Sequence, residues 1–502
     1  MTQKIKRKFG LLTAICMVVG IVIGSGVFFK AQDVLERTNG NMVQGIVSWL
    51  IGAAAMLLCA INFSTLATRY EKVNGLIDYS EATVGKKYAY FVGWFQALIS
   101  YPAMTGVLAW VSARYTLALF GSNDITGGLC IALAAAYLCS SYAINALAPK
   151  IAGKFQVGAT IIKLIPLILM AIVGLIAGLI SGNTSAAFSY KPEGGSDTFI
   201  SAVSATAFAY EGWIIATSIN AELKNAKRNL PLALVLGCGI IAVIYIIYFI
   251  GLAGAVPLSV LRGEGAPAAF LALFGKVGGT FLNVFVVISC LGTLNGLMLA
   301  DTRGMFAIAA RGQGPKPEVL QELSPRTNMP TNSSVIGLLA SGLWLFYFYG
   351  ANLASKSIFG IFSFDSSELP VITSYASYIP IMVFFMIRHG KENKFKNIVM
   401  PVLGILACLF MLFSAVYAHG IVPYRASRDA GNGFAFPVLF YLIVFAAIMA
   451  FGALFYRKDA KVREIVAWDE QEPVPNESNA SEISDDDNDE KSTDAPAEEA
   501  AR

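Results

Sequence analysis

The chain has 502 residues, of which 56% are hydrophobic and only 14% are charged. A soluble domain carries about 25% charged residues, so this composition excludes one large soluble core and predicts an all-α polytopic membrane protein. The formal net charge is +4, the only histidines are His389 and His419, and the seven cysteines fall inside apolar segments without metal-type spacing. Zinc chemistry and a Ser-His-Asp triad are therefore not expected, and we predict no cofactor, no metal site and no enzymatic activity.

The chain opens with a basic stretch, residues 1–8, that resembles the start of a signal peptide. No small-residue cleavage site closes the apolar run behind it, so we expect an uncleaved first span. A spanning helix needs about 20 apolar residues, and twelve segments meet this need. The predicted spans are 9–37, 41–68, 88–119, 127–146, 152–181, 199–221, 231–255, 276–305, 333–350, 366–388, 397–420 and 433–456.

Charges in the loops predict the orientation. With residues 1–8 placed in the cytoplasm, the loops on that side hold about three times as many Lys and Arg residues as the loops on the other side. We therefore expect a multi-pass protein of the cell membrane with both termini in the cytoplasm. From residue 457 the composition turns acidic, with a run of acidic residues at 485–490, and we predict that 457–502 is a disordered cytoplasmic tail.

The first predicted span contains a weak point at Gly24, Ser25 and Gly26. Each glycine costs about 1 kcal/mol relative to alanine inside a helix, so the segment either packs closely against a neighbour or is broken. Inside a bilayer, an unwound segment is tolerated only where protein surrounds it or where it lines a cavity. A break would leave a second half-helix beginning near Val27, whose free N–H groups suit a carboxylate.

The sixth predicted span carries a second interruption at 208–213, where Glu211 and a glycine stand among three aromatic residues. A carboxylate at this depth is costly unless it faces the interior of the bundle. If spans 1–5 and 6–10 are two repeats, the two interruptions are equivalent, and such pairs indicate the binding site of a transporter. We therefore predict an inverted repeat of five plus five helices at 9–198 and 199–388, with helices 1 and 6 broken, followed by helices 11 and 12 at 389–456.

Four motifs in this order resemble the amino acid–polyamine–organocation (APC) superfamily of transporters, and most closely its L-type amino acid transporter (LAT) branch. They are IGSGVF at 23–28, FAYEGW at 208–213, KRNLP at 227–231, and ARGQG at 310–314 followed by SPRT at 324–327. The resemblance covers residues 9–456. It implies two inverted five-helix repeats plus spans 11 and 12, and an α-amino acid substrate held between the broken helices.

The resemblance and the physics of helix ends together imply how the substrate is held. The carboxylate would meet the N–H groups at the start of the second half of span 1, and the ammonium would meet carbonyls at the half-helix ends of spans 1 and 6. Phe208 matches the aromatic gate of the family, which packs over the substrate from outside. The predicted substrate-binding residues are Ile21, Val22, Gly24, Ser25, Gly26, Val27, Phe208, Ala209, Tyr210, Glu211, Trp213 and Tyr245.

Lys163 lies deep in the fifth span, where a buried lysine is costly and indicates function. Sodium-coupled relatives place a cation near this position, so the resemblance implies that Lys163 contacts the span 1 break and span 8 and replaces sodium. Tyr245, in the middle of span 7, either packs or bridges the two breaks. Ser289 and Thr293 in span 8 are expected to bond back onto their own helix.

Glu211 departs from the family pattern, in which glycine or aspartate is common. Four interpretations stay open for it: a partner of Lys163, a proton site, a selector for cationic substrates, or a structural acceptor for N–H groups of the unwound segment. Asp365 and Glu368 open the tenth span and are expected at the outer surface.

These patterns predict a sodium-independent exchanger of small neutral L-amino acids that works by alternating access, because aromatic walls at the site favour small substrates. The alternative is a proton-coupled or cationic amino acid/polyamine antiporter. Eukaryotic LAT members attach a single-pass partner through a cysteine between spans 3 and 4, and the loop at 121–124 has none. We expect amino acid substrates and membrane lipid as partners, without nucleic acid and without a disulfide-linked subunit.

Overall fold

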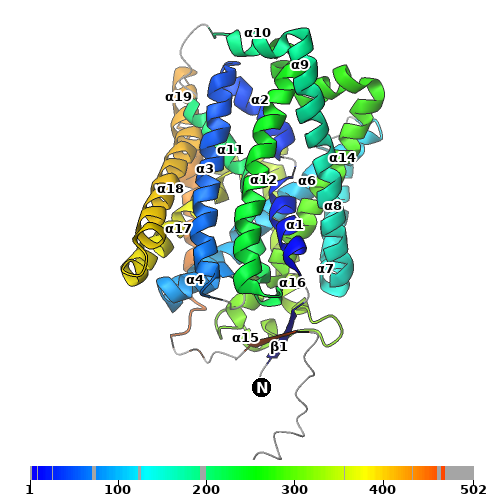
Figure 1. Ribbon diagram of the computed structural model, residues 1–502. Helices are drawn as coiled ribbons and strands as arrows, with labels where there is room; N and C mark the ends of the chain where they lie inside the picture. The colour runs from blue at the N-terminus through cyan, green and yellow to red at the C-terminus, as the bar shows by residue number, and fades with distance from the viewer. Residues whose placement is uncertain are drawn as a thin grey trace, which may run out of the picture.

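The computed structural model of the chain describes residues 3–7, 9–24, 26–70, 75–122, 126–192, 199–354, 357–431, 434–458, 460 and 465–469. These residues form a bundle of long helices that run between two ends (Figure 1). One end, the N-terminal face, carries β1 (Gln3–Arg7) and α15 (Pro317–Leu320). The other end, the far face, carries α10 (Asn183–Ser189).

The first span is a bent pair in which α1 (Leu11–Val22) and α2 (Gly26–Arg37) meet at 43°. In the described part of the chain, ten further helices or helix runs are long and apolar enough to cross a membrane. In order they are α3 (Met42–Ala67), α5–η1–α6 (Lys86–Phe95, Gln96–Ser100, Tyr101–Leu119), α7 (Gly128–Leu147), α8–η2–α9 (Pro149–Leu169, Met170–Gly174, Leu175–Ser181), α11–η3 (Phe199–Ala209, Trp213–Glu222), α12 (Ala226–Ala255), the second part of α14 (Ala266–Ala309), α16–η4 (Thr331–Phe348, Tyr349–Leu353), α17 (Leu369–His389) and η6–α18–η7–α19 (Phe395–Val399, Met400–Val416, Tyr417–Ile421, Val422–Asp429). Shorter connecting elements are α4 (Gly75–Thr83), α13 (Leu258–Glu264) and η5 (Gly360–Phe362).

The predicted all-α polytopic fold with breaks in spans 1 and 6 is confirmed, but the count of twelve spans is not. By length and composition the described residues give eleven spans when the bent pair counts as one. The difference is α20 (Pro437–Ala453), an apolar helix of 17 residues at the place of the predicted span 12. It is shorter than the roughly 20 residues that cross the hydrocarbon core of a bilayer.

Helix α12 packs against the η2–α9 part of span 5 through glycines that bring the two backbones together. A Cβ atom on Gly251 would lie 2.4 Å from the Met170 carbonyl oxygen, and one on Gly174 would lie 2.3 Å from the Gly251 carbonyl oxygen. Small residues allow such close approach between membrane helices. This contact joins spans 5 and 7, which supply Lys163 and Tyr245 to the centre of the bundle.

The prediction that the tail is disordered needs a correction near its start. Residues Ile465–Asp469 form β2, which pairs in parallel with β1 in the register Gln3 to Ile465. The sequence IVAWD is rich in residues that favour strands, and the acidic composition around it hid this signal. Residues 459, 461–464 and 470–502 of the predicted tail lie outside the described residues.

We predict that Gly251→Ala lowers the stability of the protein. The new methyl group would collide with backbone of η2, and overpacking of this kind costs about 1–3 kcal/mol. Thermal unfolding in detergent measures the effect. Gly239→Ala is the control, because it lies on the same helix with nothing within 4 Å of its Cβ position. Equal unfolding temperatures for the two variants would contradict the assigned contact.

Candidate functional site at the paired helix breaks

The first span is broken at the predicted position. Helix α1 ends at Val22, the Gly24 N–H turns back to the Val22 carbonyl at 2.8 Å, and α2 begins at Gly26. Ser25 lies outside the described residues. Because the helix stops here, carbonyls of the last turn of α1 lose their usual partners four residues ahead.

The sixth span is broken opposite the first. Helix α11 ends at Ala209, and a tight turn through Gly212, with φ of +103°, leads into the 3-10 helix η3. A Cβ atom on Gly212 would lie 2.9 Å from the Ile21 side chain, and one on Gly26 would lie 3.3 Å from the Ala209 Cα. Only glycine adopts this φ without strain. The two breaks therefore face each other at backbone distance in the interior of the bundle.

The Lys163 side chain, from α8, reaches into the first break. Its ammonium donates hydrogen bonds to the Gly20 and Ile23 carbonyls, both at 2.6 Å, and to the Thr293 hydroxyl at 3.1 Å. The side chain is fully buried. A buried ammonium is tolerated where each of its three donors has an acceptor, and here all three have one. The predicted contacts of Lys163 with the span 1 break and with span 8 are both present.

Two hydroxyl groups of α14 complete this cluster. The Thr293 hydroxyl lies 3.1 Å from the Gly20 carbonyl and 3.2 Å from the Ile23 carbonyl, and the Ser289 hydroxyl lies 3.3 Å from the carbonyls of Ile23 and Gly24. The expectation that both bond back onto their own helix is wrong. The unwound backbone of span 1 offers free carbonyls that the hydroxyls reach across the helix interface. Their spacing of one helical turn was the only sequence signal for this role.

Aromatic side chains surround the two breaks. Tyr245, from α12, donates its hydroxyl to the Val22 carbonyl at 3.1 Å, and its ring lies 5.2 Å from the Tyr210 ring between centroids. Tyr245 therefore contacts both breaks, which agrees with the interpretation that it bridges them. Trp213 is fully buried at the start of η3. These rings pack around the two breaks.

Glu211 occupies the turn between α11 and η3 and is 5% exposed. No ion pair between described residues joins it to Lys163, so the pairing interpretation fails. Its Oε2 atom has no hydrogen-bond partner among the described residues. Tyr375 and Tyr378, on α17, lie near this carboxylate and the sequence reasoning missed them. The sequence signal that could have identified them is the presence of tyrosines inside an apolar span.

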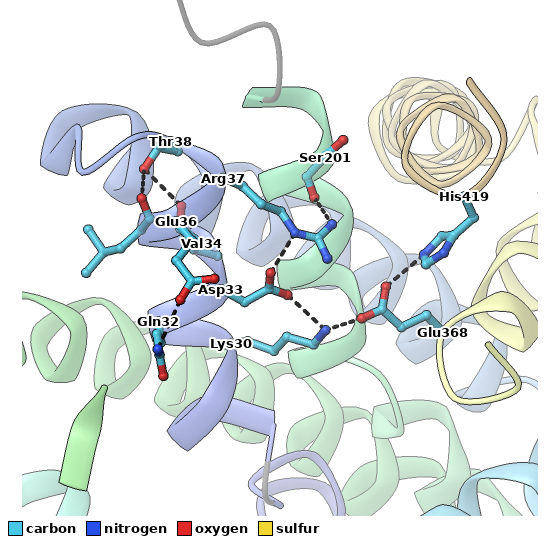
Figure 2. A network of polar contacts seen from close by, with 11 residues as sticks. Lys30, Gln32, Asp33, Val34, Glu36, Arg37, Thr38, Ser201, Glu368 and His419 are labelled. Carbon is cyan, nitrogen blue, oxygen red and sulfur yellow. Dashed lines mark hydrogen bonds and ion pairs between the residues drawn. The ribbon is translucent and has the colours of Figure 1, made fainter. Parts of the chain in front are cut away.

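A charged network, drawn in Figure 2, lies beside Phe208. The Lys30 ammonium lies 5.3 Å from the centroid of the Phe208 ring and forms ion pairs with Asp33, at 3.1 Å, and with Glu368. His419 lies 2.7 Å from the second oxygen of Glu368. The expectation that Glu368 lies at the outer surface is wrong, since it is only 7% exposed. Lys30 and His419 cover it from two sides.

Backbone pairing and an ion pair bridge the N-terminal face of the breaks. The Phe9 N–H donates to the Glu222 carbonyl at 3.1 Å, and the Lys224 N–H donates to the Phe9 carbonyl at 2.9 Å. The Glu222 carboxylate is also paired with Arg303 of α14. The segment before α1 is thus tied to the segment after η3, so both broken spans are connected at this end.

Facing breaks in the first and sixth spans of a helical membrane bundle define a transporter fold with a central site. The same fold occurs in the crystal structure of MhsT in complex with L-phenylalanine, with a TM-score of 0.55 and 15% identity over 83% of this chain and 100% of that chain. Residues 9–448 match the family model described as amino acid permease. The chain belongs to this amino acid permease family of the APC superfamily.

Curated relatives extend over nearly the same region. The serine/threonine exchanger SteT of Bacillus subtilis is 32% identical over 82% of this chain and 92% of its own length. The b(0,+)-type amino acid transporter 1 of Mus musculus is 26% identical over 83% of this chain and 84% of its own length. The glutamate/serine transporter AimA of Bacillus subtilis is 24% identical over 83% of this chain. These relatives are amino acid transporters or exchangers.

We predict that Lys163→Met destabilises the protein far more than Lys154→Met, which removes an exposed lysine from the same helix. The buried Gly20 and Ile23 carbonyls would lose a charged donor, which costs about 2 kcal/mol or more. Thermal unfolding of the two purified variants measures the difference. Equal stability would show that the ammonium does not support the break.

Proposed function

We propose that this chain is a sodium-independent exchanger of small neutral L-amino acids that works by alternating access across the cell membrane. The single observation that carries the proposal is the Lys163 ammonium bound to the carbonyls of the first break. Carbonyl and hydroxyl oxygens at a helix break are the ligands that transporters of this architecture use for a coupling cation. A resident ammonium satisfies those oxygens, so transport needs no sodium ion there.

The proposed substrate lies between the two breaks. Its carboxylate accepts hydrogen bonds from the N–H groups of Ser25, Gly26 and Val27, at the positive end of the α2 dipole. Its ammonium meets carbonyls at the C-terminal ends of α1 and α11, near Ile21 and Val22 and near Phe208 and Ala209. The backbone thus recognises the groups that all amino acids share, and side chains select among them.

The side chains around the two breaks support a small substrate. Phe208 lies against the first break, within 3.5 Å of the Cβ position of Gly26, and Tyr210 and Trp213 are fully buried beside the second. Small side chains such as those of alanine, serine and cysteine suit this space. The exchange of serine and threonine by SteT, the relative at 32% identity, supports the same class.

The loop charges support an orientation in which the N-terminal face is cytoplasmic. The pairing of β1 with β2 brings the chain segments near both ends to one face, which agrees with two cytoplasmic termini. The loop between α6 and α7 carries no cysteine, which supports a protein without a disulfide-linked partner subunit.

We predict that proteoliposomes holding unlabelled serine take up labelled alanine or serine much faster than empty proteoliposomes. Replacing sodium by choline on both sides should leave that rate unchanged, because the Lys163 ammonium occupies the cation position. Scintillation counting of filtered vesicles measures uptake. Full-rate uptake into empty vesicles would contradict exchange, and loss of uptake without sodium would contradict the role of Lys163.

The second candidate function is a proton-coupled or cationic amino acid/polyamine antiporter. The buried Oε2 of Glu211, without a partner among the described residues, favours it, since a free carboxylate oxygen can bind a proton or a cationic substrate group.

We predict that Glu211→Gln preserves alanine exchange under the leading proposal, because amide and carboxylate have similar shape. Under the alternative, the same variant loses arginine or polyamine transport and its dependence on a proton gradient. Competition of unlabelled arginine and putrescine against labelled alanine, in both proteins, separates the two. If neutral substrates move and cations neither move nor compete, the cationic alternative is wrong.

A further inference from the structure

Aromatic side chains fasten the C-terminal end of α20 to the start of span 3. The Tyr90 hydroxyl, on α5, donates to the Gly452 carbonyl at 2.6 Å, and the Trp94 indole N–H donates to the Ile448 carbonyl at 3.0 Å. The Tyr456 ring lies 5.4 Å from the Tyr90 ring between centroids. Tyrosine and tryptophan rings gather where the hydrocarbon core of a membrane meets water. The cluster therefore indicates that this end of α20 lies at a membrane boundary.

A groove and a pocket open beside these rings, and together they are named the α5–α20 site. The groove is lined by side chains that include Lys86, Lys87, Tyr88, Phe91 and Tyr456. The pocket shares Lys86 with the groove and adds Glu81, Arg311 and Lys458. Glu81 belongs to α4, which lies at the N-terminal face (Figure 1). The site therefore lies at this face, between α4, the start of span 3 and the end of α20.

Positive charge is in excess in the α5–α20 site. Arg311 is paired with Glu81 at 2.9 Å, so these two charges offset each other. Lys86, Lys87 and Lys458 are exposed, and none of them forms an ion pair with another residue that the structure describes. Three ammonium groups thus line one site without a described carboxylate to neutralise them. An anionic group such as a phosphate complements this charge.

Exposed apolar side chains adjoin the three lysines. Near the end of α20, Leu454 is 76% exposed and Phe451 is 55% exposed. The Phe451 ring lies 6.3 Å from the Trp94 ring, which ties it to the aromatic cluster. A ligand that covers both parts of this surface needs an anionic head and an apolar tail. A phospholipid has both, whereas a free phosphate ion has only the first.

We infer that the α5–α20 site binds an anionic phospholipid. Its phosphate lies among Lys86, Lys87 and Lys458, and its acyl chains run along the exposed apolar end of α20. Basic pockets between membrane helices bind acidic lipid headgroups, and each lysine near the headgroup adds to the attraction. Because α20 is a short helix of 17 residues, a lipid bound here stabilises its attachment to span 3. The inference is independent of the proposed exchange of amino acids.

The first test compares two lipids that differ in headgroup charge. The full chain is purified in detergent, stripped of lipid and titrated with phosphatidylglycerol or with phosphatidylcholine that has the same acyl chains. Native mass spectrometry counts the bound lipid, and thermal unfolding is followed in the same samples. Phosphatidylglycerol should bind more than tenfold more tightly and should raise the unfolding temperature. Equal binding of the two lipids would overturn the inference.

The second test removes the charge of the site. Lys86→Gln, Lys87→Gln and Lys458→Gln, combined in one protein, should weaken phosphatidylglycerol binding by about a hundredfold, because each lysine near a headgroup contributes about fivefold. All three side chains are exposed, so the variant is expected to fold. Undiminished binding of phosphatidylglycerol to this protein would overturn the site.

A matched control removes the same charge elsewhere on the N-terminal face. Lys391, Lys394 and Lys396 are exposed and follow α17, whose Arg388 donates to the Ala82 carbonyl of α4. Changing these three lysines to glutamine should leave phosphatidylglycerol binding unchanged. Equal losses in the two triple variants would show attraction by the whole basic face, and that result would overturn a defined site.

Two measurements separate a phospholipid from a free anion. Inorganic phosphate and soluble glycerol phosphate, each at the concentration of the lipid, should neither raise the unfolding temperature nor displace phosphatidylglycerol. Leu454→Ser should weaken phosphatidylglycerol binding several-fold, because it removes apolar contact without removing charge. Stabilisation by inorganic phosphate equal to that by the lipid would overturn the inference in favour of a simple anion site. Unchanged lipid binding in Leu454→Ser would overturn the placement of the acyl chains.

Discussion

One ammonium group stabilises the place where the first span comes apart. Breaking a helix inside a membrane frees carbonyls that no water can satisfy, and each unsatisfied group is costly. Lys163 donates to two of them, at Gly20 and Ile23, and Thr293 and Ser289 reach the same backbone from α14. These donors satisfy carbonyls that the break leaves without partners in their own helix.

The rest of the bundle positions those donors. The glycine contact between α12 and the η2–α9 segment joins spans 5 and 7 at backbone distance, so that Lys163 and Tyr245 reach α1 from two sides. The second break then faces the first through Gly212 and Ala209. Two unwound backbones and their supporting side chains thus form one central unit.

Each end of this unit is bridged by groups of a different kind. Side-chain charges around Glu368 lie beside Phe208, whereas backbone pairing of Phe9 with the segment after η3 closes the N-terminal face. The Glu222–Arg303 ion pair lies next to that backbone pairing. The two ends are therefore held by different kinds of contact.

The membrane class, the two breaks and the burial of Lys163 could be predicted from the chain alone, because apolar length, glycine position and an isolated charge are local signals. Tertiary structure decided which groups meet the free carbonyls, that Glu211 has no pair with Lys163, and that Glu368 is buried beside His419. It also replaced the start of the predicted disordered tail with β2 and left α20 short of a full span. The contacts among these outcomes join residues far apart in the sequence, and no local pattern in the chain records such contacts.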